Sequence, residues 1–232
     1  MGRRHNLVLQ VNIDSGRRGD SMFSFVPDLY DYASRAAMAY AKSTGASYLV
    51  LREPVLDIYG FHPAWQRYVM FEEAFDIYDQ VLYLDADVVA GGPDIFRQYD
   101  APGFHAVPVL DSDPAVGPGI MASIQRQIDL FDLDLASYFN SGVMLVDRET
   151  RQQIRAMQWK SRILDYNQED QPTINKIVQE AVGLKRLDWR YNCLLKRPDQ
   201  LERARQAYFI HFLGKELFRA VVPANGGSGN RI

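Results

Sequence analysis

The sequence is poor in cysteine, in long apolar runs and in excess charge of either sign. Its one cysteine among 232 residues, Cys193, excludes an intramolecular disulfide and a zinc site built from several cysteines. No apolar run reaches the roughly 20 residues that span a bilayer. The 26 basic and 29 acidic residues leave a net charge of -3, which gives no global electrostatic reason to bind nucleic acid. The N-terminus also lacks a signal-peptide core, so we expect a cytoplasmic protein with no transmembrane segment and no nucleic-acid partner.

What the chain does contain is the pattern of a folded α/β domain. Apolar residues make up 47% and charged residues 24% of it, which excludes a disordered or fibrous architecture. Short apolar runs alternate with stretches of helical spacing, with no internal repeat and no long linker. This predicts a single domain over residues 1–222, with a mostly parallel central sheet flanked by helices and ligands beyond the carboxyl ends of the strands. The glycine-rich residues 223–232 are predicted to form a flexible tail.

The periodicity also predicts where the strands and helices lie. Strands are expected at residues 7–11, 48–51, 81–84, 104–110, 142–146, 184–187 and 207–210. Helices are expected at residues 26–40, 63–75, 154–163 and 172–181, where Pro63 and Pro172 suit a first helical turn and glycines follow the first and last helix.

The sharpest chemical signal is a pair of carboxylates after the expected strand at 81–84. Asp85 and Asp87 lie one residue apart at its carboxyl end. Two anionic oxygen ligands there suit a divalent cation, which in turn neutralises a diphosphate. The same spacing recurs at Asp111/Asp113 and Asp132/Asp134. The former lies in a proline-rich loop and the latter alternates with apolar residues, so position favours the first pair. The alternative for that pair is a solvated loop whose carboxylates cap helices.

A second signal follows the last expected strand. His211 comes directly after the apolar run 207–210, and Gly214 and Lys215 follow it. An imidazole at a strand end, a glycine that admits a close backbone approach and a lysine that can pair with phosphate suit a metal–nucleotide site. The alternative for His211 is a partly buried side chain without a ligand.

Polar residues also stand at the entrance to a strand and to a helix. Asn140 precedes the strand at 142–146 and offers both a donor and an acceptor to hydroxyls, while Gly142 leaves room for a ring. Asp170 and Gln171 stand directly before Pro172, where an ordinary helix entry is the alternative interpretation.

Together these motifs resemble a metal-dependent glycosyltransferase of the GT-A fold, closest to family 8, which includes glycogenin and bacterial lipopolysaccharide galactosyltransferases. The resemblance rests on four motifs that occur in the family's order over roughly residues 45–215. They are YLDADV at 83–88, FNSGVML at 139–145, Asp170-Gln171 with Asn175, and HFLG at 211–214. It implies a Rossmann-like, nucleotide-sugar-binding domain.

The resemblance also assigns roles to residues. It implies that Asp85, Asp87 and His211 hold the cation, which the imidazole nitrogen suggests is Mn²⁺, with Mg²⁺ as the alternative. The remaining roles fall to donor-binding residues. These are Asn140 and Asp170 at the sugar hydroxyls, Gln171 beside the anomeric centre, Arg67 near the sugar and diphosphate, and Gly142, Asn192, Gly214 and Lys215 around the nucleotide sugar.

The implied reaction moves a hexose from a nucleotide-diphosphate sugar, with UDP expected, to a hydroxyl of a glycan or glycoconjugate. Family 8 implies retention of the anomeric configuration; inversion would need a carboxylate base, for which Asp170 and Asp113 are candidates. Two other activities stay open. A nucleotidyltransferase would use the loop at 16–19, and a degenerate GT-A protein would bind the donor without transferring it. The run GPGIMA at 117–122 formally fits a dinucleotide-binding motif, without a clean strand before it.

Overall fold

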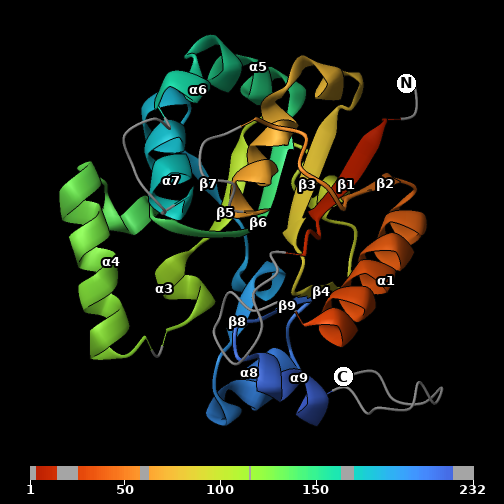
Figure 1. Ribbon diagram of the computed structural model, residues 1–232, viewed down its shortest axis with the longest axis vertical. Coiled ribbons are helices and arrows are strands. Elements are labelled where there is room, and N and C mark those ends of the chain that lie inside the picture. The colour runs from red at the N-terminus through yellow and green to blue at the C-terminus, as the bar shows by residue number, and fades with distance from the viewer. Residues whose placement is uncertain (1–3, 15–25, 58–62, 115, 163–169, 222–232) are drawn as a thin grey trace.

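The computed structural model describes residues 4–14, 26–57, 63–114, 116–162 and 170–221, in which the strands form two sheets (Figure 1). The larger sheet has the strand order β2-β1-β3-β6-β5-β7 and the smaller one the order β4-β9-β8. The strands of the larger sheet are β1 (Asn6–Val11), β2 (Ser47–Leu51), β3 (Gln80–Asp85), β5 (Phe104–Pro108), β6 (Phe139–Asp147) and β7 (Leu184–Arg186). Those of the smaller sheet are β4 (Val88–Ala90), β8 (Cys193–Leu195) and β9 (Phe209–Phe212).

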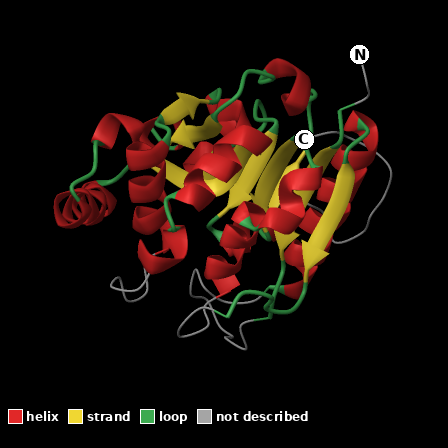
Figure 2. Cartoon of the chain, turned by 90° about the horizontal axis from the view of Figure 1, so that it is seen from above, coloured by secondary structure: helices red, strands yellow, loops and turns green. Residues whose placement is uncertain are grey.

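Helices lie on both faces of the larger sheet (Figure 2). The α-helices are α1 (Pro27–Thr44), α2 (Ile95–Gln98), α3 (Val109–Ser112), α4 (Pro118–Phe131), α5 (Arg148–Ala156), α6 (Trp159–Arg162), α7 (Asp170–Ala181), α8 (Leu201–Ala204) and α9 (Lys215–Val221). The 3₁₀ helices are η1 (Pro63–Phe71), η2 (Glu73–Ile77), η3 (Leu135–Ser137), η4 (Trp189–Tyr191) and η5 (Pro198–Gln200). This architecture confirms the predicted α/β domain with a mostly parallel sheet.

One strand of the larger sheet runs against the others. β1 pairs in parallel with β2 and β3, and β5 with β7, whereas β6 is antiparallel to both β3 and β5. The register of β3 and β6 pairs Leu84 with Val143. Because of this reversal, the residues that open β6 lie beside the residues that end β3. β6 begins earlier than the predicted 142–146 and includes Asn140, so Asn140 and the carboxylate of Asp85 meet at one edge of the sheet.

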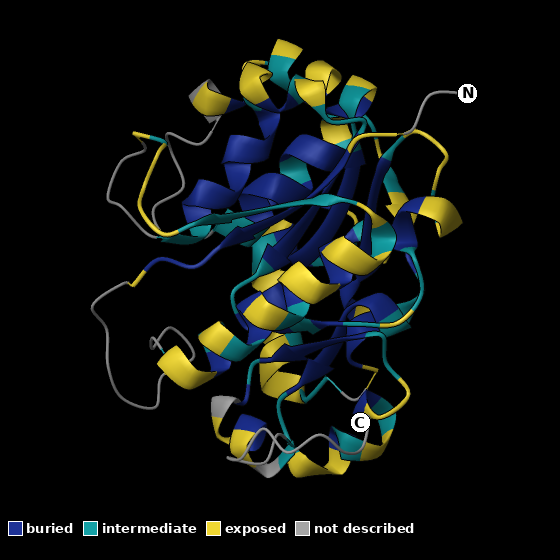
Figure 3. Ribbon diagram, turned by 90° about the vertical axis from the view of Figure 1, so that its right-hand side faces the viewer, coloured by how far each residue is buried: buried dark blue, intermediate teal, exposed yellow. Residues whose placement is uncertain are grey.

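Alternation along the strands builds a core on each face of this sheet. In β1, Leu7 and Leu9 contribute to a cluster with η1, α5 and α7, while Val8 points to the cluster under α1 and α2. Burial of the inner surfaces is visible in Figure 3, where the exposed residues of α1 form a stripe along its outer side. α1 begins at Pro27, a position where a backbone N–H would have no partner within the helix. It ends at Thr44 and is followed by Gly45, whose φ of 70° is the left-handed conformation that suits glycine.

The smaller sheet was not expected from the sequence. Asp87 leads directly into β4, which pairs with β9 in the register Val88↔His211. The last strand is therefore shifted toward the C-terminus relative to the predicted 207–210, and His211 lies inside it rather than after it. β9 also pairs in parallel with β8, and the sheet covers a separate apolar cluster that includes Leu195, Phe212 and Phe218. Three-residue strands such as β4 and β8 carry too few residues for an alternation to be recognised.

Other predicted elements are found with altered limits. The strand expected at 104–110 ends at Pro108, which has no N–H for the ladder, and α3 follows. The helix expected at 63–75 consists of η1 and η2, and the one expected at 154–163 is divided at Gln158, whose φ is 53°. α4 was not expected. It covers the run 117–122, where an added Cβ on Gly117 or Gly119 would contact nothing within 4 Å, so no close approach requires glycine there.

None of the described helices is long and apolar enough to cross a membrane. The predicted flexible tail and the loop at 16–19 lie outside the described residues. The division of the chain into a domain at 1–222 and a tail stays a prediction.

Candidate functional site

Seven of the predicted site residues line a pocket at the edge of the larger sheet where β1 and β3 end. Its lining comes from both sheets, from η1, from the start of β6 and from the start of α7. The lining residues are Val11, Ile13, Tyr30, Pro63, Ala64, Arg67, Tyr83, Asp85, Ala86, Asp87, Asn140, Ser141, Asp170, Gln171, His211 and Leu213. Residues from seven parts of the sequence thus meet at the carboxyl ends of two parallel strands, as expected for an α/β sheet.

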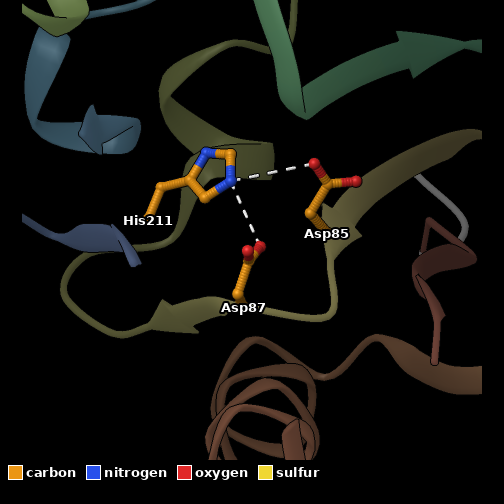
Figure 4. Close-up of side chains that lie close together, drawn as sticks. All are labelled: Asp85, Asp87 and His211. Carbon is orange, nitrogen blue, oxygen red and sulfur yellow. Dashed lines mark ion pairs between the residues drawn. The ribbon is translucent and has the colours of Figure 1, made fainter. Parts of the chain in front are cut away.

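The carboxylates of Asp85 and Asp87 converge on the imidazole of His211 (Figure 4). The Nε2 atom of His211 lies 3.1 Å from Oδ1 of Asp87 and 3.8 Å from Oδ2 of Asp85. One ligand atom from each of the three residues lies within 4.8 Å of the others. The imidazole is buried, while both carboxylates keep a partly exposed side toward the pocket.

Strand pairing explains why these three side chains meet. Asp85 ends β3 in the larger sheet, and Asp87 comes two residues later, immediately before β4 in the smaller one. The backbone N–H of Phe212 donates to the carbonyl of Asp87 at 3.0 Å, which places β9 and its His211 directly beside the carboxylates. The site therefore joins the two sheets.

Asp85 is held in a fixed orientation by its neighbours. Its Oδ1 accepts a hydrogen bond from the hydroxyl of Tyr83 at 2.6 Å and pairs with the guanidinium of Arg67 at 3.2 Å. These contacts leave Oδ2 facing His211. Burial raises the pKa of Asp85, and the guanidinium of Arg67 opposes this most strongly. A further cation next to Oδ2 would favour the ionised form.

Arg67 connects Asp85 to the start of α7. Its guanidinium lies 3.1 Å from Oδ2 of Asp170 and donates to the carbonyl of Ser141 at 3.0 Å. The side chain is 5% exposed. Burial alone would lower the pKa of Arg67, but the carboxylates of Asp170 and Asp85 outweigh it and raise the pKa. Arg67 therefore stays positively charged and holds the carboxylates of Asp85 and Asp170 in place.

A chain of amide side chains runs behind the pocket. Nδ2 of Asn140 donates to Oε1 of Gln171 at 3.2 Å, and Oδ1 of Asn140 accepts from Nδ2 of Asn192 at 3.0 Å. Oδ1 of Asn192 lies 3.2 Å from Nδ1 of His211. Asn192 itself is fully buried and does not line the pocket. The structure thus places Asn192 behind the histidine.

Gly142 is a glycine because His211 occupies the space that a side chain would need. An ideal Cβ there would lie 2.3 Å from Cε1 and 2.5 Å from Nδ1 of the imidazole. Both distances are far inside van der Waals contact, and the imidazole is 2% exposed and has nowhere to move. The ring for which Gly142 leaves room in this structure is therefore the imidazole.

The three converging side chains fit a divalent cation. Ligand bonds of about 2.1 Å place neighbouring ligands of one ion about 3 Å apart. The 3.1 Å between Nε2 of His211 and Oδ1 of Asp87 matches this, and the 3.8 Å to Oδ2 of Asp85 is somewhat longer. Two carboxylate oxygens and one imidazole nitrogen form a mixed set that transition-metal ions accept. A single cation among them would also offset the repulsion between two carboxylates one residue apart.

Gly214 is not among the described residues that line the pocket. Gly214 packs against β8, where an added Cβ would come within 2.7 Å of the carbonyl oxygen of Lys196. Its glycine therefore serves backbone packing between β8 and the start of α9. Lys215 opens α9, and its side chain lies outside the described part of the structure. Their proposed contacts with the nucleotide stay predictions.

Several pocket residues were missed by the sequence analysis. Tyr30 reaches the pocket from α1, and Ile13 and Leu213 add apolar surface. Burial raises the pKa of Tyr30, and the charges of Asp87 and Asp85 raise it further, which places its hydroxyl in their field. An aromatic residue at helical spacing is indistinguishable from a core residue in the sequence. Position after a strand was a usable signal for Ile13, two residues beyond β1, and for Leu213, directly after β9.

Comparison with known proteins identifies the family. The profile described as Glycosyl transferase family 8 matches residues 31–216, which include the pocket residues from Arg67 to His211. The chain belongs to glycosyl transferase family 8. A search of curated proteins by sequence found no significant match.

Solved structures show the same fold for this family 8 glycosyltransferase. WbbM, a bifunctional glycosyltransferase, is 13% identical with a TM-score of 0.61, over 90% of this chain and 46% of its own. A glycosyltransferase involved in glycosylation of the major capsid of PBCV-1 is 14% identical with a TM-score of 0.60, over 94% of this chain and 100% of its own. The galactosyltransferase LgtC is 15% identical with a TM-score of 0.51, over 89% of this chain and 86% of its own. The chain thus spans less than half of WbbM but nearly all of the other two, and these likenesses confirm the GT-A fold.

Proposed function

We propose that this family 8 glycosyltransferase transfers a hexose from a nucleotide-diphosphate sugar, with UDP as the nucleotide, to a hydroxyl of a glycan or glycoconjugate. The observation that carries the proposal is the convergence of Asp85, Asp87 and His211 in a pocket that also contains Asn140, Asp170 and Gln171. A divalent ion held there would neutralise the leaving diphosphate.

The chain's own residues would position the sugar. Asn140 and Asp170 both line the pocket, and Arg67 contacts Asp170 and Ser141, the residue after Asn140, so both side chains can offer hydrogen bonds to sugar hydroxyls. Gln171 is held by its amide between the backbone N–H of Ser141 and the hydroxyl of Tyr138. That support fixes its orientation beside the proposed anomeric centre.

Manganese is the proposed ion, in preference to magnesium. Magnesium prefers oxygen ligands and retains its water, whereas the imidazole of His211 adds a nitrogen to the set. We expect activity with Mn²⁺ to exceed that with Mg²⁺ and to fall strongly in His211→Ala. Equal activity in both ions, unaffected by that substitution, would contradict the assignment.

Binding of the donor is the first test. Thermal shift and calorimetry with Mn²⁺ and a panel of UDP, GDP and their sugars should show stabilisation that requires the metal, greatest for the UDP compounds. No stabilisation by any of these nucleotides would reject the proposal. Metal-dependent hydrolysis of the bound donor sugar then separates a working transferase from a protein that only binds the donor.

The stereochemical course is proposed to be retention. An inverting enzyme needs a carboxylate within reach of the acceptor hydroxyl, and the two candidates were Asp170 and Asp113. Asp170 is paired with Arg67, and Asp113 is fully buried and outside the pocket lining. Neither is placed as a free base. The anomeric coupling constant in the product NMR spectrum should therefore show the configuration of the donor, and the opposite configuration would reject retention.

A further inference from the structure

Asn192 contacts the proposed metal ligand His211 from the side away from the pocket. It is fully buried and lies between the end of η4 and the start of β8. Its amide bridges Nδ1 of His211 at 3.2 Å and Oδ1 of Asn140 at 3.0 Å. Which end of the amide faces the imidazole decides which imidazole nitrogen carries a proton, and that in turn decides whether Nε2 can bind a cation.

Backbone N–H groups can only donate a hydrogen bond. Two of them therefore determine the orientation of the side-chain amides of Asn140 and Gln171. The N–H of Gly142 lies 3.1 Å from Asn140, so the atom it meets must be the oxygen Oδ1. The N–H of Ser141 lies 3.3 Å from Gln171, which identifies Oε1 in the same way. Asn140 therefore presents its oxygen toward Gly142 and its NH₂ toward Gln171, and the two anchors agree.

The orientation of Asn192 follows from that of Asn140. Because Oδ1 of Asn140 is an acceptor, the atom of Asn192 that faces it must be the donor Nδ2. The opposite end, Oδ1 of Asn192, then faces Nδ1 of His211 and requires a proton on that nitrogen. A flipped Asn192 would bring two acceptors together at Asn140.

We propose that Asn192 is the positioning residue that selects the Nδ1-protonated form of His211, so that the lone pair of Nε2 points at the cation site between Asp85 and Asp87. This inference rests on the proposed metal site. A histidine ligand whose second ring nitrogen donates to a fixed acceptor has a defined tautomer and a fixed ring orientation, and losing such a partner costs 10–100-fold in metal affinity as an order of magnitude.

Manganese binding, measured by the loss of the free Mn²⁺ signal in electron paramagnetic resonance, tests this role. Asn192→Leu keeps the volume and removes the acceptor, so we expect Mn²⁺ affinity to fall by about 10–100-fold. Asn192→Asp keeps an acceptor for Nδ1 but turns its second oxygen toward Oδ1 of Asn140, so we expect a loss of affinity that is clearly smaller than in Asn192→Leu. A merely structural role would weaken both variants equally, or the buried charge of aspartate more, and that order would overturn the proposal.

The buried Asn6 at the opposite edge of β1 supplies a matched control. Asn6→Leu removes a buried amide far from the pocket and should leave Mn²⁺ affinity unchanged. If it weakens binding as much as Asn192→Leu does, loss of fold stability explains the effect and the proposal fails.

Nitrogen NMR of the Zn²⁺-loaded protein reads the tautomer directly, because zinc is diamagnetic. The chain has 4 histidines, so His211 can be assigned by comparison with His211→Gln. We expect a protonated Nδ1 and a metal-bound Nε2, and the opposite pattern would overturn the proposal. This readout needs no sugar donor. Failure of the donor-binding test with the expected nitrogen pattern would reject the proposed function alone, and the reverse result would reject only the role of Asn192.

Discussion

Two Asp-x-Asp pairs follow strands of the same sheet but lie in different surroundings. Asp85 ends β3 and Asp87 follows it, and both face a pocket, where Asp85 contacts Tyr83 and Arg67 and both carboxylates face the imidazole of His211. Asp113, in contrast, follows β5 and α3 and is 0% exposed at its side chain. It accepts a hydrogen bond from Gln200 and pairs with Lys196 at 3.4 Å.

The difference lies in how far the protein itself compensates each charge. The carboxylate of Asp113 has Lys196, Arg197 and Gln200 around it, and its neighbour Asp111 pairs with Arg186 on the surface. Such a pair is satisfied without an ion. The pair at Asp85 and Asp87 has carboxylate oxygens turned toward one imidazole and lines the pocket. An identical spacing in the sequence thus favours a metal site only where the carboxylates face a pocket.

The largest effect is expected from Asp87→Asn, which keeps the shape of the side chain and removes one anionic ligand. Turnover should fall by a factor of 100 or more if metal stabilisation contributes roughly 3 kcal/mol to the transition state. Without metal, the melting temperature should hold or rise, because the repulsion between Asp87 and Asp85 is relieved. Initial rates of donor hydrolysis with Mn²⁺ and metal-free thermal melts check both parts. Full activity in Asp87→Asn would show that Asp85 and Asp87 are not the pair that binds the metal.

Gly142→Ala should weaken the same site without altering any ligand. The new methyl group would occupy the position of the His211 ring, so we expect Mn²⁺ affinity to fall about tenfold or more, since a displaced imidazole cannot complete the ligand set. Calorimetric titration with Mn²⁺ measures this. Gly119→Ala is the matched control, because an added Cβ there meets nothing within 4 Å. Unchanged affinity in Gly142→Ala would mean that His211 is dispensable.

Asp113→Asn should show the reverse pattern, with stability lost and chemistry retained. It leaves the positive charges of Lys196 and Arg197 beside a neutral amide, but both are partly exposed, so we expect a loss of about 2 kcal/mol. The melting temperature should drop by roughly 4–8 °C, while most of the turnover per folded molecule remains. Thermal melts and donor hydrolysis on the same sample separate the two. A stable but inactive Asp113→Asn would reverse the comparison.

The third pair supplies the smallest effect. Asp134 caps η3, with its side chain accepting from the N–H of Ala136 at 3.1 Å, and Asp132 is exposed with a φ of 50°. Asparagine caps a helix as well as aspartate does, so Asp134→Asn should change the free energy of unfolding by no more than about 0.5 kcal/mol. Urea denaturation measures it, and activity should stay at the original level. A large loss of either would show that a surface pair has an unrecognised role.

The sequence predicted the fold class and the residues that converge in the pocket, because strand ends carry a local signal. Asp85 follows an apolar run, and Asn140 precedes one. The reversal of β6 was not predictable, since an apolar run has the same composition in either direction, and this reversal brings Asn140 beside Asp85.

Other parts of the site depend on long-range packing. No local pattern predicts that Tyr30 lines the pocket or that the ring of His211 lies against Gly142. Both contacts join segments that are far apart along the chain. The smaller sheet was missed for the same reason. Its strands are only three or four residues long and pair across the chain.

The division of the ligands between two sheets has a consequence for local unfolding. Asp85 belongs to the six-stranded sheet and His211 to the three-stranded one, so an ion bound to both residues would connect the two sheets. Opening the smaller sheet alone would then release the ion, and mass action would oppose that opening. Amide hydrogens of β9 should exchange more slowly when Mn²⁺ is present, while those of β1, deep in the larger sheet, should keep their rates. The metal would thus set how often the last strand opens.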